Sequence, residues 1–294
     1  MLFQAFTVLI LSVSAFGQLP AFDADRAYAD LKSQCAFGPR NPGSEAHRKC
    51  LEWLTQQFRD LGLQPTLQTF SGADPEAGVT HRLTNLIVRI PGQQGDPLML
   101  CAHWDSRPRA DRDPDSSLQN QPIPGANDGA SGVAVLLEIA RLAAQSQPPR
   151  TLLIALWDGE DLGRATRPEE FALGSRYWAA HQVPEPPSEA ILLDMVGDAD
   201  LEIPVEQFSD AGAPELRRRL WELARELELP AFVDRWGAAV EDDHLSLLRA
   251  GIPAVDLIDF DYDYWHTTAD TPDKCSAESL GEVGRLLISY IYGK

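Results

Sequence analysis

Positive charge is scarce in this sequence. Only 25 Lys and Arg residues stand against 44 Asp and Glu, which gives a formal net charge of −19. Nucleic acids and anionic membrane surfaces select patches of Lys and Arg, because these side chains neutralise phosphate. The charge balance therefore argues against both partners. It suits a soluble protein, and substrates that carry a free cationic amine.

Cysteine is also scarce, and its spacing carries no metal motif. The four cysteines never form the Cys-x-x-Cys pattern of zinc sites, so we consider them poor metal ligands. In an exported protein, Cys35 and Cys50 could pair between the first two expected helices. Cys101 lies inside the apolar run 97–102 and is expected to be a buried thiol.

The N-terminal region has no charged side chain. Its apolar run, residues 2–16, is short for a membrane anchor, and small residues surround Gly17 at its end. We interpret residues 1–17 as a secretory signal peptide, although the usual leading Lys or Arg is missing. The mature protein would then begin at Gln18 and be secreted or periplasmic.

No internal repeat is present, and strand and helix patterns alternate along the chain. A chain of 294 residues with 44% hydrophobic content can bury one large core, so we predict one α/β domain over residues 18–294. Strands are expected at 63–70, 83–90, 97–102, 151–157, 191–196 and 252–258. Helices are expected at 23–36, 44–61, 214–227 and 242–250, from about 130 to 144, from 174 onward, and after Ser276.

What the sequence does have is acid at the ends of apolar strands. The run 152–157 leads directly into Asp158, Glu160 and Asp161. Neighbouring carboxylates raise one another's pKa, so such a group is costly without a cation. In an open α/β sheet, side chains beyond the carboxyl ends of the strands can converge on one site. The other candidates after apolar runs are His103, Asp105, Asn127, Asp128, Asp194 and His266.

Three of these side chains match the ligand set of a catalytic zinc ion. Such an ion takes three protein ligands from His and carboxylates and keeps one position open. Asp128, Asp161 and His266 satisfy that count, although each has an ordinary explanation: a helix cap, a loop acid, and a ring packed beside Trp265. Asp128 is expected in the first turn of the following helix. Their joint placement at strand ends favours a metal enzyme, with the irregular segment 105–124 as part of the site rim.

The motifs, in their order along the chain, resemble the zinc aminopeptidase-like superfamily over nearly all of residues 18–294. They are His103-Trp-Asp, Asn127-Asp-x-x-Ser-Gly, Asp158-Gly-Glu-Asp, Gly174-Ser, Leu193-Asp-Met-Val-Gly and Trp265-His-Thr. Within the superfamily, the chain is most similar to the animal-type glutaminyl cyclases (glutaminyl-peptide cyclotransferases), especially their bacterial relatives. The closer match uses His103-Trp-Asp-Ser-Arg-Pro, Pro122-Ile-Pro-Gly, Asp242-Asp-His, Gly251-Ile-Pro and the long segment between Asp161 and Gly174.

The resemblance implies a fold and an activity. The fold would be a central mixed, twisted β-sheet flanked by helices on both faces. The activity would be conversion of the N-terminal glutamine of peptides or proteins to pyroglutamate, with release of ammonia. One zinc ion would be held by Asp128, Asp161 and His266, with no nucleic-acid partner and no membrane contact beyond the signal peptide.

The resemblance also implies roles for four further residues. Glu160 would be the proton shuttle, and Asp194 and Asp242 would complete an acidic hydrogen-bonded group around it. Trp265 would shape the pocket for the glutamine side chain.

Three positions depart from the animal pattern. Asp161 stands where animal enzymes have Glu, which a ligand position tolerates. Thr166 falls where simple spacing places a pocket tryptophan, so Phe171 or an aromatic residue among 260–264 would have to fill the gap. Asp256 replaces a histidine of the acidic group.

A di-zinc aminopeptidase remains the main alternative. His103 and Asp194 are also present where such enzymes bind a second metal, so ligand identity leaves a two-metal site open. A catalytically inactive binding protein on the same fold is a third class, disfavoured because Glu160 is retained. The remaining histidines, His47, His81 and His181, lie in polar stretches and are expected on the surface.

Overall fold

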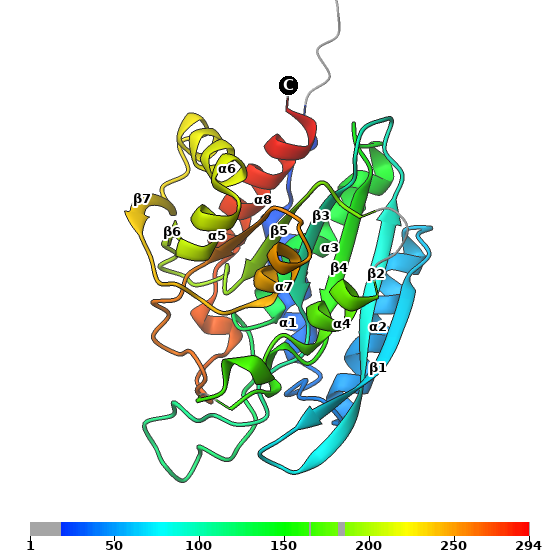
Figure 1. Cartoon of the computed structure of the whole chain (residues 1–294). Coiled ribbons are helices and arrows are strands. Elements are labelled where there is room, and N and C mark those ends of the chain that lie inside the picture. The colour runs from blue at the N-terminus through cyan, green and yellow to red at the C-terminus, as the bar shows by residue number, and fades with distance from the viewer. Residues whose placement is uncertain (1–18, 165, 182–185, 294) are drawn as a thin grey trace, which may run out of the picture.

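The computed structural model describes residues 19–164, 166–181 and 186–293. The expected signal peptide and Gln18 lie outside the described residues. A six-stranded sheet crosses the molecule in the order β1-β2-β4-β3-β5-β8 (Figure 1). Its strands are β1 (Thr66–Asp74), β2 (Val79–Ile90), β3 (Leu98–His103), β4 (Leu152–Trp157), β5 (Glu189–Asp194) and β8 (Ala254–Ile258).

The sheet is mixed, as expected. β1, β2 and β4 pair antiparallel, whereas β4, β3, β5 and β8 run parallel to one another. Every residue of β3, β4 and β8 is buried, which explains why these runs read as uniformly apolar. Because the parallel strands end at one edge, the loops that follow β3, β4 and β8 gather at the lower end of the molecule in Figure 1.

Helices cover both faces of the sheet (Figure 1). Alternate residues of β3 point to opposite faces: Leu98 and Leu100 join one apolar cluster, and Met99 and Cys101 another. The first face is covered by α1 (Ala24–Cys35), α2 (Glu45–Asp60), α3 (Ala130–Gln145) and α8 (Ala277–Tyr292). The second is covered by α4 (Leu173–Ala180) and α7 (Asp243–Arg249).

Beside the main sheet lies a smaller unit that the sequence patterns did not reveal. Its elements are β6 (Ile203–Val205), α5 (Gln207–Gly212), the expected α6 (Pro214–Glu226) and β7 (Phe232–Trp236). β6 and β7 form a two-stranded parallel sheet. β6 has only three residues and contains Pro204, and β7 is mostly exposed and charged, so neither has a strand signature. Short 3₁₀ turns occur at Glu160–Leu162, Pro168–Glu170 and Pro272–Lys274.

The helix starts were predicted well where a side chain caps them. Asp23, Ser44 and Ser276 each accept a hydrogen bond from a backbone N–H of the first turn. The expectation for Asp128 was wrong, because α3 begins two residues later and Gly129 occupies the cap position. No helix in the described part of the chain is long and apolar enough to cross a bilayer.

The cysteines take no part in cross-linking. Cys35 and Cys50 are free thiols in the structure, so the suggested pairing between α1 and α2 is not present. Cys101 is fully buried within β3, as predicted.

Candidate active site

The carboxyl ends of the parallel strands deliver the chemistry. His103 is the last residue of β3, and Asp194 is the last residue of β5. β4 ends at Trp157, and the next residues turn through Gly159 into the 3₁₀ turn that carries Glu160 and Asp161. Because β3 lies between β4 and β5, His103 occupies the centre of this group.

Asp128, Asp161 and His266 form one buried cluster of potential metal ligands. One ligand atom from each lies within 4.8 Å of the others. The Nε2 atom of His266 is 3.4 Å from Oδ1 of Asp161 and 3.7 Å from Oδ2 of Asp128. The sequence prediction that these three residues converge is therefore confirmed as a matter of geometry.

The electrostatics of this cluster fit a divalent cation. Burial raises the pKa of Asp128, and the neighbouring charge of Asp161 raises it further. Burial opposes a proton on His266, but Asp161 and Asp111 outweigh that effect and raise its pKa to about 9. Oδ2 of Asp161 is buried and has no hydrogen-bond partner among the described residues. Two carboxylates and an imidazole at this spacing are the donor set of a catalytic zinc site.

Asp270 holds the loop that carries Asp128. Its carboxylate accepts hydrogen bonds from the backbone N–H groups of Asn127 (2.8 Å) and Asp128 (3.2 Å), and from the Tyr262 hydroxyl (2.8 Å). The chain then turns at Gly129, whose φ of +104° is a conformation that L side chains rarely adopt. A Cβ atom there would lie 2.4 Å from the carbonyl oxygen of Asp105, so only glycine fits beside the ligand.

Two side chains of the irregular segment 105–124 fix Asp161. Arg107 is fully buried and donates hydrogen bonds to Oδ1 of Asp161 (2.7 Å) and, through two other nitrogens, to Asp111 (2.8 and 2.7 Å). Asp105 accepts from the backbone N–H groups of Glu160 (3.2 Å) and Asp161 (3.4 Å). The interpretation of this segment as part of the site is confirmed, but the anchoring roles of Arg107, Asp105 and Asp270 were missed.

Glu160 and Asp242 are carboxyl groups whose pKa values are shifted upward. Burial raises the pKa of Glu160 well above its ordinary value, and the charges of Asp242 and Asp161 add to the effect. Burial also raises the pKa of Asp242, with Asp194 as the largest charge contribution. Asp242 occupies the N-cap of α7 and faces the same cavity as Asp194. Such carboxyl groups retain a proton near neutral pH, as a proton carrier must.

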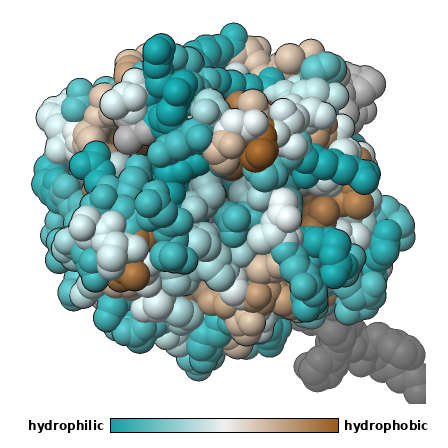
Figure 2. Space-filling view, turned by 90° about the horizontal axis from the view of Figure 1, so that it is seen from below, coloured by the Kyte–Doolittle hydropathy of each residue, from teal (hydrophilic) through white to brown (hydrophobic). Residues whose placement is uncertain are grey.

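These groups line a cavity of about 410 Å³ with aromatic walls. Trp265 stacks on the His266 ring at a centroid distance of 3.9 Å, and Phe260 packs against Trp265. Phe171 also lines the cavity, whereas Thr166 is exposed and does not. The expectation that Phe171 or an aromatic residue among 260–264 fills the pocket is confirmed. The molecular face seen in Figure 2 is mostly hydrophilic, with a few separate hydrophobic patches.

A second group of potential ligands shares Asp128 with the first. Nε2 of His103 lies 3.2 Å from both Asp128 and Asp194, and these three residues also meet within 4.8 Å. The opposite ring nitrogen of His103 is buried and lacks a hydrogen-bond partner in the described part of the chain. The two-metal alternative thus has a geometric basis.

Two expectations were wrong. Asp158 turns away from the other carboxylates: it meets Nε2 of His47 at 2.8 Å and accepts a hydrogen bond from the backbone N–H of Thr84. His47 is accordingly buried, and its ring stacks on Trp104 at 4.3 Å. It was expected on the surface because its partners come from distant parts of the sequence. His181 is exposed, as predicted.

The acidic group extends behind Asp242. His244 is fully buried between Glu206 (3.3 Å) and Asp256 (3.6 Å), and Asp242, His244 and Asp256 also meet within 4.8 Å. The histidine that the animal pattern places at position 256 is thus accompanied here by a histidine from α7. Glu206 has no strand-end pattern in the sequence and was missed.

Comparisons with known proteins agree with this site. The model of Peptidase family M28 matches residues 85–291. The crystal structure of Bacteroides thetaiotaomicron glutaminyl cyclase bound to N-acetylhistamine is 35% identical, with a TM-score of 0.89 over 94% of this chain and 100% of that one. A Zn-dependent exopeptidase from Parabacteroides distasonis is 34% identical, with a TM-score of 0.90 over the same shares. Bovine glutaminyl-peptide cyclotransferase is 24% identical over 289 residues, which cover 86% of this chain and 77% of the relative. The chain belongs to Peptidase family M28.

Proposed function

We propose that the protein is a zinc-dependent glutaminyl cyclase, which converts the N-terminal glutamine of peptides or proteins to pyroglutamate and releases ammonia. The observation that carries the proposal is one cavity in which the Asp128, Asp161 and His266 cluster, Glu160 and an aromatic wall meet. The similarity to proteins named glutaminyl cyclases, over nearly the whole chain, supports it.

We assign one zinc ion to Asp128, Asp161 and His266. When bound, zinc supplies a Lewis acid that polarises the substrate's side-chain amide oxygen. Asp270 and Arg107 keep two of the ligands in place through the hydrogen bonds described above. Chelation should abolish activity reversibly, and full activity in metal-free protein would contradict the assignment.

Glu160 carries the proton in this mechanism. The substrate's α-nitrogen forms a bond to the δ-carbon of the glutamine side chain, and the bond from that carbon to the amide nitrogen breaks. Glu160 takes a proton from the attacking amine and gives it to the departing nitrogen, which leaves as ammonia. Both reacting groups belong to one residue, so ring closure is intramolecular and needs little further machinery.

The cavity supplies orientation. Trp265 and Phe171 provide apolar walls for the methylene groups of glutamine, while Glu160, Asp194 and Asp242 provide negative charge for the α-amine. The carboxylates of Asp194 and Asp242 also adjust how readily Glu160 binds its proton.

Product analysis tests the proposal directly. A dipeptide Gln-X and a chromogenic Leu-amide are offered in parallel, and ammonia and free amine are measured separately. We expect ammonia release and a product lighter by one ammonia. Release of the amine alone would identify an aminopeptidase and overturn the proposal.

A di-zinc aminopeptidase is the second candidate, and the His103, Asp128 and Asp194 group is the observation that favours it. Two metal ions in such sites share ligands and activate water. Elemental analysis distinguishes the candidates: one zinc ion per chain supports the cyclase, and two tightly bound ions support the peptidase. His266→Ala serves as the control that loses the assigned ion.

We also propose that the protein is exported, secreted or periplasmic, on the basis of the apolar leader 1–17. Cleavage after Gly17 would expose Gln18, which makes the chain a candidate substrate for its own activity. Mass spectrometry of the exported protein tests both parts. An N-terminus at Gln18 that stays uncyclised in the presence of active enzyme would exclude self-modification.

A further inference from the structure

Arg112 stands out in the cavity by its charge. It is the one Lys or Arg side chain among the described residues that line the cavity, where the carboxylates are those of Asp128, Glu160, Asp161, Asp194, Glu241 and Asp242. The chain as a whole carries a net charge of −19. A lone exposed guanidinium at the wall of an acidic pocket has no evident role in binding a cationic α-amine, so its contribution must concern another part of the substrate.

The backbone around Arg112 is held firmly against the metal-ligand loop. The Arg112 N–H donates to the carbonyl oxygen of His266 (3.2 Å). On one side, Asp111 lies 3.3 Å from Nδ1 of His266. On the other, Asp113 accepts hydrogen bonds from the backbone N–H (2.9 Å) and hydroxyl (2.6 Å) of Thr268. Three consecutive residues are thus tied to the loop, so little backbone entropy is lost when Arg112 binds a partner.

The side chain of Arg112 is placed as well. Its guanidinium carbon lies 5.2 Å from the centre of the Trp265 ring, a cation–π arrangement. The opposite neighbour of Trp265 is the His266 ring, at 3.9 Å. Two successive ring contacts therefore separate the guanidinium from the metal ligand. One or two extended residues cover such a span at roughly 3.3 Å each.

We infer that Arg112 selects peptides with an acidic side chain just after the N-terminal glutamine. This inference rests on the proposed cyclase function and names the substrate class that the site prefers. The first residue occupies the carboxylate-lined interior, so the next side chain passes Trp265 and meets Arg112. A carboxylate there pairs with the guanidinium, whereas a lysine side chain is repelled by it.

A peptide series measures this preference. The substrates are Gln-Glu-Gly-amide, Gln-Ala-Gly-amide and Gln-Lys-Gly-amide, whose amidated ends leave the second side chain as the only variable charge. We expect kcat/KM for the Glu peptide to exceed that for the Lys peptide by about two- to fivefold, the range of an exposed ion pair. The ratio should fall toward one in 0.5 M NaCl, because salt screens exposed charges.

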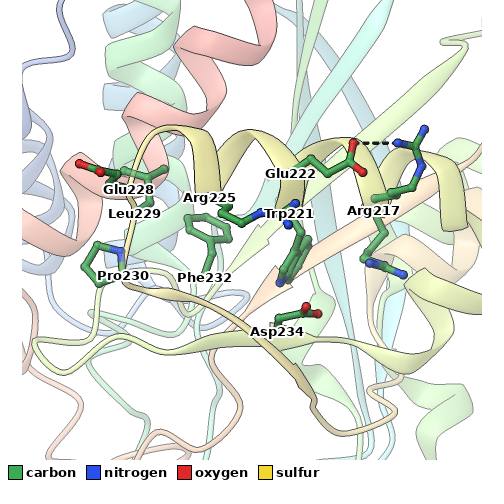
Figure 3. A pocket seen from close by; sticks show the side chains of 10 residues that line it. Arg217, Trp221, Glu222, Arg225, Glu228, Leu229, Pro230, Phe232 and Asp234 are labelled. Atoms are coloured by element: carbon green, nitrogen blue, oxygen red, sulfur yellow. Dashed lines mark hydrogen bonds and ion pairs between the residues drawn. The ribbon is translucent and has the colours of Figure 1, made fainter.

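Variants assign the preference to the side chain. Arg112→Lys keeps the charge and should keep a ratio above one, while Arg112→Glu should invert it. Arg225→Glu is the matched control, because it makes the same charge change on an exposed arginine. Arg225 lies in a separate cavity of about 500 Å³ between α6 and β7, which shares no lining residue with the active-site cavity (Figure 3). The control should have the wild-type ratio.

Each contrary result has a distinct meaning. If wild-type enzyme releases no ammonia from the Ala peptide, the cyclase function itself fails. If it cyclises all three peptides equally, or if Arg112→Glu leaves the ratio unchanged, the inference about Arg112 is overturned. A preference for the Lys peptide would also overturn it, and would assign selection to Glu241, whose exposed carboxylate lines the same cavity.

Discussion

At the scale of single residues, the site depends on backbone conformations that the side-chain pattern does not reveal. His266 has a φ of 56° and Met195, directly after Asp194, has a φ of 47°. Non-glycine residues with positive φ are uncommon and cluster at functional sites, where surrounding contacts hold them. The Arg112 N–H bonded to the carbonyl of His266 is one such contact. The ligand identities could be predicted, but this local geometry could not.

Glu160→Gln tests the proton carrier. The change keeps the size of the side chain and removes its ability to exchange a proton, so kcat should fall by roughly 10²–10⁴-fold, the usual contribution of general acid–base catalysis. Zinc content and thermal unfolding should match wild type, because Glu160 lies outside the proposed ligand set. A variant that keeps more than about a tenth of wild-type turnover, far less than that loss, would move the role to another residue.

Asp270→Asn tests the support of Asp128. The amide is nearly isosteric but uncharged, so the backbone hydrogen bonds that hold the Asp128 loop become weaker. We expect zinc affinity, measured by competition with a chromophoric chelator, to fall about 10- to 100-fold.

Asp259→Asn is the matched control for this change. Asp259 is likewise buried and accepts hydrogen bonds from the backbone N–H groups of Glu202 and Asp261, but it does not line the active-site cavity. Equal zinc affinity in wild type and Asp270→Asn would show that Asp270 does not position the ligand.

At the scale of elements, apolar runs sufficed for the six strands of the main sheet. β3, β4 and β8 are buried along their whole length, so their sequences had to be apolar. The sequence could not reveal β6 and β7, because a three-residue strand and an exposed strand have little apolar surface to encode. α3 packs closely under β5 at Gly132, where a Cβ atom would lie 2.3 Å from the Leu193 carbonyl oxygen, consistent with the small residues noted in its sequence.

His47→Ala tests how α2 is joined to the end of β4. The imidazole of His47 is the buried partner of Asp158, which immediately follows β4 and lies two residues before Glu160. Removing it leaves a buried carboxyl group without that partner, which costs about 1–3 kcal/mol. Urea unfolding should show this loss of stability. His181→Ala, at an exposed position, should change stability by less than about 0.5 kcal/mol, and equal effects of the two changes would contradict the role of His47.

At the scale of the whole molecule, the site was predictable in part because one edge of a parallel sheet collects distant segments. Asp128, Asp161 and His266 could be grouped from their places after apolar runs, without knowledge of the strand order. Asp270 and Arg107 could not, because they follow no strand and act through loops that only the folded chain brings together. The burial of His47 was mistaken for the same reason.

The buried carboxyl groups make stability depend on pH, with a sign that can be worked out. Burial raises the pKa of Asp158 and Asp259 to about 6 and that of Asp243 to about 7. Their unfolded pKa is about 3.9, so between pH 4 and 7 the folded chain binds more protons than the unfolded chain. Stability from these groups is present below pH 4 and is lost as pH rises through 7. Glu206 acts oppositely, since its pKa is lowered to about 2, but its contribution is complete near pH 4.5.

Zinc-free protein should therefore have a higher Tm at pH 5 than at pH 8. Zinc binds deprotonated ligands, so its affinity rises with pH, and binding to the folded state alone adds stability as pH rises. The decline in Tm from pH 5 to pH 8 should accordingly be smaller in the zinc-loaded protein. Thermal unfolding at four pH values between 5 and 8, with a chelator or with excess zinc, measures both slopes. Parallel slopes would mean that the ion does not bind the ionisable cluster, and a chelated protein that gains stability toward pH 8 would contradict the raised carboxyl pKa values.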